Sequence, residues 1–170
     1  GWGFNGLRKV FNRIEPASHL RQKYQDIVGE HPEGARFILF CDNHDVAHNT
    51  SQGVIRTEDQ DDETWRKEVQ FMGIPWEGMK PGSRNDRVWG VKGGDVALVY
   101  LFCLDGVPFL YYGQEIADTA PHNIYARSSI DWDMAGTPEA QGRHRLCARL
   151  CELRHTERAI SDGDLTWLDN

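Results

Sequence analysis

Two short, largely apolar runs constrain the fold of this chain more than any other feature of its sequence. The first is Phe37–Phe40, and the second is Val107–Tyr112, which has Pro108 close to its start. Runs of this length are too short for ordinary helices and are typical of strands that are covered on both faces. A proline is tolerated near the start of a strand, because the missing N–H does least damage there. We therefore predict two buried strands.

The segments around these runs have the patterns of helices. We expect a helix that Pro16 opens and Gly29 ends, a buried helix over Val96–Leu104 that Asp95 caps, and a helix from Thr137-Pro138 to about His155. An earlier helix with Leu7, Val10, Phe11 and Ile14 on one face, and a last strand over Leu165–Leu168, complete the prediction. Helices that alternate with strands in this way favour a parallel α/β sheet or barrel.

Two strands form a poor sheet on their own and cannot close a barrel. The 170 residues have the size of one domain, whereas a complete eightfold β/α barrel takes roughly 250 residues. We therefore expect the missing strands to come from the rest of the polypeptide, from another subunit or from a second copy.

Composition excludes some kinds of partner. The formal net charge of −7 argues against nucleic acid or an anionic membrane, since phosphate binding needs concentrated Lys and Arg. No apolar stretch reaches the roughly 20 residues that span a bilayer, and the cellular location is left open. The four cysteines lack zinc or redox spacing, so we expect buried free thiols at Cys41, Cys103, Cys147 and Cys151.

Polar side chains follow each predicted strand directly. Asn43, His44 and Asp45 come after the first strand, and Glu115 comes soon after the second. The carboxyl ends of parallel strands carry the catalytic groups of many α/β enzymes. Short polar clusters also commonly end strands without any catalytic role, so this segment alone leaves both explanations open.

Two motifs in register carry a resemblance to a known family. Phe40–Asp45 resembles the Phe-x-x-Asn-His-Asp signature that ends the seventh barrel strand in the α-amylase family of glycoside hydrolases, family 13. Gly106–Ile116 is similar to the Gly-x-Pro-x-x-Tyr-x-Gly-x-Glu segment of that family's eighth strand, and it follows the expected helix. Further similarities to the way the family closes its barrel lie at Arg127, Trp132, Leu150–Arg154 and Gly163.

The resemblance implies a fold and a division of the chain. Residues 1–160 would be the carboxy-terminal portion of a (β/α)8 TIM barrel, about strands seven and eight with their flanking helices. Residues 161–170 would begin a carboxy-terminal β domain.

The resemblance also implies roles for the first motif. Asp45 matches the catalytic carboxylate that stabilises the oxocarbenium-like transition state, and His44 with Asn43 matches the substrate-binding positions. Hydrogen bonds to sugar hydroxyls that strengthen as charge develops provide differential transition-state binding. For Tyr112 and Glu115 we favour structural roles, at the strand end and in the following loop.

Half of the required chemistry is absent from the chain. A retaining glycosidase needs a nucleophile and a general acid about 5 to 5.5 Å apart. The family's motifs for both are missing, and the early carboxylates lie in helical or turn contexts, at Glu15, Asp26, Glu30 and Glu33. We expect part of a retaining α-glycosidase or transglycosylase that acts on α-linked glucans or oligosaccharides, with no cofactor and no metal. The isolated chain would be inactive and would need the missing barrel half in cis or in trans.

Two rival interpretations remain. A non-catalytic carbohydrate-binding or assembly relative of the barrel would also lack the two carboxylates. The spacing of His44 and His48 is that of a helical zinc pair, but the neighbouring residues leave no length for such a helix.

A long polar excursion separates the two motifs, from Val46 to Gly90. Its acidic cluster, residues 58–63, lacks the spacing of an EF-hand and is expected to be solvated. Trp65, Trp76 and Trp89 are candidates for stacking on sugar rings, although burial within the excursion explains them equally well.

Overall fold

The computed structural model describes residues 7, 9–10, 14–43, 85–118 and 129–168. Its elements follow in the order α2 (Ser18–Gly29), β1 (Ile38–Leu39), α5 (Asn85–Cys103), β2 (Val107–Pro108), η1 (Gln114–Ile116), η2 (Trp132–Gly136), α6 (Pro138–Thr156) and α7 (Arg158–Ser161). The predictions for Phe11, for His44, Asp45 and His48, for the acidic cluster and for Arg127 lie outside the described residues, as do Trp65 and Trp76. No helix in the described part of the chain has both the length and the apolar character needed to cross a membrane.

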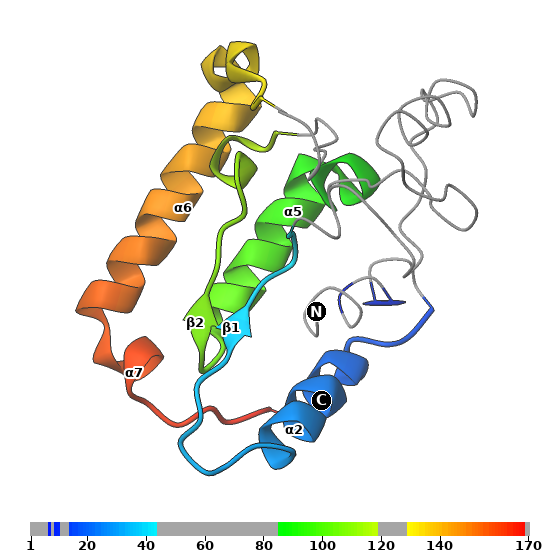
Figure 1. Ribbon diagram of the computed structural model, residues 1–170, viewed down its shortest axis with the longest axis vertical. Helices are drawn as coiled ribbons and strands as arrows, with labels where there is room; N and C mark the ends of the chain where they lie inside the picture. The colour runs from blue at the N-terminus through cyan, green and yellow to red at the C-terminus, as the bar shows by residue number, and fades with distance from the viewer. Residues whose placement is uncertain (1–6, 8, 11–13, 44–84, 119–128, 169–170) are drawn as a thin grey trace, which may run out of the picture.

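The two predicted strands form and pair in parallel. Ile38 pairs with Val107, and Leu39 pairs with Pro108. The amide N of Val107 donates to the carbonyl O of Phe37 at 2.7 Å. The ladder is shorter than the apolar runs that predicted it, since each strand has only two residues in it. The chain between the two strands includes α5, and Figure 1 shows β1 and β2 side by side.

One side of this small sheet carries the core. Leu39 and Cys41 alternate toward buried side chains of α5 and α6, as the two-residue period of a strand requires. The cluster comprises Leu7, Tyr24, Leu39, Cys41, Ala97, Leu98, Leu101, Phe102, Leu104, Cys147 and Leu150. The helices α5 and α6 contact each other. The core therefore fills the space between the helices and one face of the sheet.

The opposite side of the sheet is apolar and exposed. Ile38 is 65% exposed, Val107 is 51% exposed and Phe109 is 42% exposed. The rings of Phe40 and Phe109 meet edge to face with centroids 6.3 Å apart. A sheet face of this composition is typical of a surface that further strands or side chains cover.

The prediction for α6 and the predicted end of α2 are confirmed, whereas α2 begins at Ser18, two residues after the predicted start at Pro16. α2 ends at Gly29, and its buried Tyr24 donates its hydroxyl hydrogen to the carbonyl O of Asp105 at 3.2 Å. α6 begins after Thr137, whose Oγ1 accepts a hydrogen bond from the amide N of Ala140 at 3.2 Å. This bond satisfies one of the free amides of the first turn.

The prediction for the central helix is correct in type and wrong in its start. α5 begins at Asn85 instead of after Asp95, and Gly90 interrupts its regular backbone with φ 74° and ψ 164°. Asp95 lies inside the helix, and its carboxylate binds Arg143 of α6 instead of capping a helix end. The helix is buried along one face only, because Val96 and Val99 are exposed.

The predicted strand over Leu165–Leu168 is wrong. These residues form no strand, and the ring of Trp167 instead lies against Tyr24 of α2 with centroids 6.0 Å apart. A strand needs a hydrogen-bonded neighbour, and here a side-chain contact holds the segment instead. Whether residues 161–170 begin a β domain stays a prediction.

The four cysteines are free, as predicted, but they are not all buried. Cys41 and Cys147 are buried, Cys151 is half-buried and Cys103 is exposed. Cys103 is exposed because it is the last residue of α5 and lies off its buried face. Burial raises the pKa of the Cys147 thiol to about 11.

Candidate functional site: the carboxyl ends of the two strands

The predicted site residues lie at the carboxyl end of β1. Asn43 is half-buried and directly follows Asp42, which is fully buried. His44 and Asp45 are the next two residues in the sequence and fall outside the described part of the chain. The structure therefore describes the strand end that leads into the predicted site, but not the side chains of His44 and Asp45.

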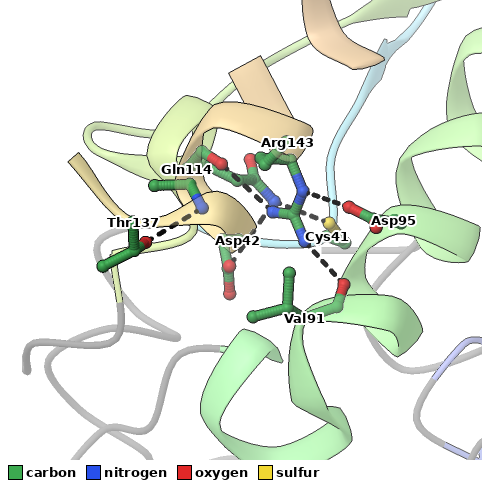
Figure 2. A network of polar contacts seen from close by, with 8 residues as sticks. Cys41, Asp42, Val91, Asp95, Gln114, Thr137 and Arg143 are labelled. Carbon is green, nitrogen blue, oxygen red and sulfur yellow. Dashed lines mark hydrogen bonds and ion pairs between the residues drawn. The ribbon is translucent and has the colours of Figure 1, made fainter. Parts of the chain in front are cut away.

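The turn after β2 lies against this strand end. Figure 2 shows the Gln114 side chain directed toward Cys41 and Asp42. Its Nε2 donates to the Sγ of Cys41 at 3.0 Å and lies 3.5 Å from the Oδ2 of Asp42. Its Oε1 accepts a hydrogen bond from the amide N of Tyr111 at 3.0 Å. Because the strands are parallel and adjacent, their carboxyl ends meet at one edge, as the sequence predicted.

Arg143 of α6 connects this edge to α5. Its Nη1 donates to the carbonyl O of Gln114 at 3.1 Å, and its Nη2 donates to the carbonyl O of Val91 at 2.8 Å. Its Nε donates to the Oδ1 of Asp95 at 2.5 Å. The guanidinium is fully buried, whereas the Asp95 side chain is 35% exposed. Figure 2 shows the three bonds radiating from one guanidinium, two to α5 and one to η1.

A tight turn shapes the segment that carries Gln114. Gly113 has φ 79°, and a Cβ at this position would lie 2.9 Å from the Cβ of Asp118. The amide N of Asp118 donates to the carbonyl O of Gly113 at 3.0 Å, and Asp118 is fully buried. Ala117 has φ 57°, a left-handed conformation that costs a residue with a side chain about 1 kcal/mol or more. The turn is thus closely packed on its inner side.

The two residues of the second motif with predicted structural roles have different surroundings. Tyr112 is half-exposed, and its ring lies edge to face against that of Tyr111 with centroids 6.4 Å apart. Glu115 lies in η1 and is half-buried. Their predicted roles stay predictions.

The described residues can orient a site, but they do not form a catalytic pair. Gln114 and Arg143 donate into carbonyls, a carboxylate and a thiol, so their polar atoms are engaged within the protein. Among the described residues, no three His, Cys, Asp or Glu side chains are grouped closely enough to hold a metal ion.

Sequence reasoning missed the buried polar residues Asp42, Gln114, Asp118 and Arg143. A signal for Arg143 does exist, because it precedes Cys147 and Leu150 by four and seven residues and so lies on the buried stripe of α6. A charged residue on an apolar stripe predicts a buried partner of opposite charge. No comparable local pattern identifies Asp95 as that partner.

Comparisons with known proteins give a partial match. Over 89 residues, 48% of the chain, the sequence is 36% identical to a cyclomaltodextrinase of Geobacillus thermopakistaniensis (strain MAS1). The matched stretch spans 14% of that protein, so the chain corresponds to a small part of this relative. No family model matches the chain, and no solved structure matches it. The match supports a relationship to α-glucan-acting glycoside hydrolases at this general level.

Proposed function

We propose that this chain forms the seventh and eighth strands, with their helices, of a family 13 glycoside hydrolase barrel. In this proposal Asp45 is the carboxylate that stabilises the transition state, and His44 and Asn43 bind the sugar. The substrate is an α-linked glucan or oligosaccharide. The nucleophile and the general acid come from the missing part of the barrel.

The observation that carries the proposal is the parallel register of β1 and β2. This pairing brings the end of the strand that continues into Asn43 next to the turn that contains Gln114. The two sequence motifs that resemble the family's seventh and eighth strands thus end at the same edge, with a helix-containing crossover between them. A parallel pair joined in this way is the repeating unit of a β/α barrel.

The exposed face of the sheet supports the need for further strands. Ile38, Val107 and Phe109 direct apolar surface away from the helices. In a closed barrel this face is the interior, which side chains of the other strands fill in layers. Burial of such surface stabilises a protein by about 25 cal/mol per Å², so covering this face would favour barrel closure.

The proposed chemistry follows from the charge that develops during glycoside cleavage. As the leaving group departs, the sugar ring becomes positively charged, and a carboxylate at Asp45 would stabilise that charge more than it stabilises the neutral substrate. An imidazole at His44 would hold a ring hydroxyl in place. Both groups lower the barrier only if the strand end holds them in a fixed position.

Replacement of Asp45 by Asn in the complete protein tests the proposal. We expect kcat on malto-oligosaccharides and cyclomaltodextrins to fall at least about 100-fold, with an unchanged melting temperature, because one transition-state interaction is lost. Asp164→Asn is the matched control, since Asp164 is exposed in the carboxy-terminal segment. Near-normal turnover of the Asp45→Asn variant would contradict the proposal. Sugar binding without any turnover by the unmodified complete protein would instead support a non-catalytic carbohydrate-binding relative.

A further inference from the structure

We propose that Gln114 is a positioning residue for the segment that leaves β1. Its side chain holds Cys41 and Asp42, and through them it sets the point from which Asn43 continues toward His44 and Asp45. This inference rests on the proposed function, because it matters for turnover only if that segment carries catalytic groups.

The argument begins where the strand ladder ends. A backbone hydrogen bond near the carboxyl end of β1 runs from the amide N of Phe109 to the carbonyl O of Leu39, at 2.8 Å. Cys41 and Asp42 follow β1 at its carboxyl end. The Gln114 amide supplies contacts between the two segments at this place, 3.0 Å from Cys41 Sγ and 3.5 Å from Asp42 Oδ2.

Both the nitrogen and the oxygen of the Gln114 side-chain amide form hydrogen bonds. Nε2 faces the β1 end, and Oε1 accepts from the amide N of Tyr111 in the turn itself. The side chain is 1% exposed, so water does not compete for these bonds. A buried amide with both ends engaged has one favourable orientation and thus links the two segments in a fixed geometry.

Gln114 is itself held from outside the turn. Its carbonyl O accepts from Arg143 Nη1, and the same guanidinium binds Asp95 and the carbonyl O of Val91. Two helices therefore fix the backbone from which the amide reaches the strand end. A rigid supporting shell of this kind is what a catalytic group needs, since a displacement of about 1 Å can cost 10²-fold in rate.

Two substitutions separate positioning from packing. Gln114→Leu keeps a similar volume and removes all three hydrogen bonds of the side-chain amide. Gln114→Glu keeps the acceptor for Tyr111 but turns the donor into an oxygen that faces Asp42. In the double variant Asp42→Asn, Gln114→Glu, the new amide at position 42 can donate to the new carboxylate at position 114. The hydrogen bond between the two positions is then restored with donor and acceptor exchanged, so the link between the two segments can recover.

The test is steady-state kinetics of the complete protein on malto-oligosaccharides, together with melting temperatures. For Gln114→Leu we expect kcat to fall about 10- to 100-fold with KM changed less than about threefold, since the positions of catalytic groups and not ground-state binding are altered. The Asp42→Asn, Gln114→Glu double variant should have a kcat at least about fivefold above that of Gln114→Glu alone, because the two positions are coupled. Gln25→Leu, an exposed glutamine on α2, serves as the matched control and should leave kcat unchanged.

Two results would overturn the inference. One is a Gln114→Leu protein with kcat within about twofold of the parent, and the other is a double variant that is no more active than Gln114→Glu. If the Gln114→Leu protein does not fold, the comparison of kcat between Gln114→Glu and the double variant tests the inference on its own. An inactive Asp45→Asn protein beside a fully active Gln114→Leu protein would refute the positioning role only, whereas a fully active Asp45→Asn protein would refute the proposed function.

Discussion

Replacement of Arg143 by Met is the sharpest test of the tertiary structure. Met fills much of the same space but donates no hydrogen bonds, so the change removes the contacts to Asp95, Gln114 and Val91 together. The two carbonyl oxygens lose a donor, and the Asp95 carboxylate loses its partner. No other single side chain in the described part of the chain is shown bonding to both α5 and the turn after β2.

The magnitude follows from burial. Removing one partner of a buried ion pair typically costs 3–5 kcal/mol, because the other charge is left unpaired. The Arg143 side chain is fully buried, but that of Asp95 is 35% exposed and regains some hydration. We therefore expect the low end of the range, about 3 kcal/mol. For a chain of this size that loss corresponds to a fall in melting temperature of about 6–12 °C.

The assay is unfolding of the parent and variant proteins by heat and by urea, followed by tryptophan fluorescence. Arg149→Met on the same helix is the matched control, since its ion pair with Glu152 is between side chains 62% and 58% exposed. The control should change stability by no more than about 0.5 kcal/mol. Adding Asp95→Asn to Arg143→Met should recover about 1–2 kcal/mol by removing the unpaired charge. A loss below about 1 kcal/mol for Arg143→Met would refute the reasoning.

Three further predictions concern other parts of the fold. Thr137→Ala removes the side-chain cap of α6 and should cost about 1 kcal/mol in urea unfolding; an unchanged midpoint would contradict the cap. Gly106→Ala should cost about 1–3 kcal/mol or more, because its φ is +149° and a Cβ there would lie 2.7 Å from Leu39 Cδ1; equal melting temperatures would show that the packing is looser. Burial raises the pKa of Cys147 from 9.0 to about 11, so the folded state holds this proton more tightly and stability should decline as pH rises from 9 to 11. Cys147→Ala should lack that part of the decline, and an identical pH dependence would argue against the raised pKa.

Local patterns were sufficient wherever a few neighbouring residues decide the structure. Thr137-Pro138 predicted the start of α6 because capping and a proline in the first turn act within four residues. The end of α2 at Gly29 was also predicted, as were the positions of both strands. Periodicity and capping are interactions along the chain, so they can be read without knowledge of distant segments.

The predictions were wrong where contacts between segments far apart in the chain determine the structure. The carboxylate of Asp95 could cap a helix by its local pattern, yet in the structure it binds Arg143, which lies 48 positions further along. The tail at Leu165–Leu168 has an apolar pattern, but it lies against Tyr24 and not beside a strand. In both cases the alternative partner is available only after the chain has folded.

The sequence by itself determined the kinds and order of α2, β1, α5, β2 and α6, and the two motifs that resemble family 13. These depend on residue types and on spacing within short segments. Only the tertiary structure decided the register in which β1 and β2 pair, that Gln114 reaches Cys41, and that Arg143 ties the common edge of the strands to α5. These contacts join residues that lie 29 to 73 positions apart in the chain, and such pairings are favourable only when packing of the core has already brought the segments together.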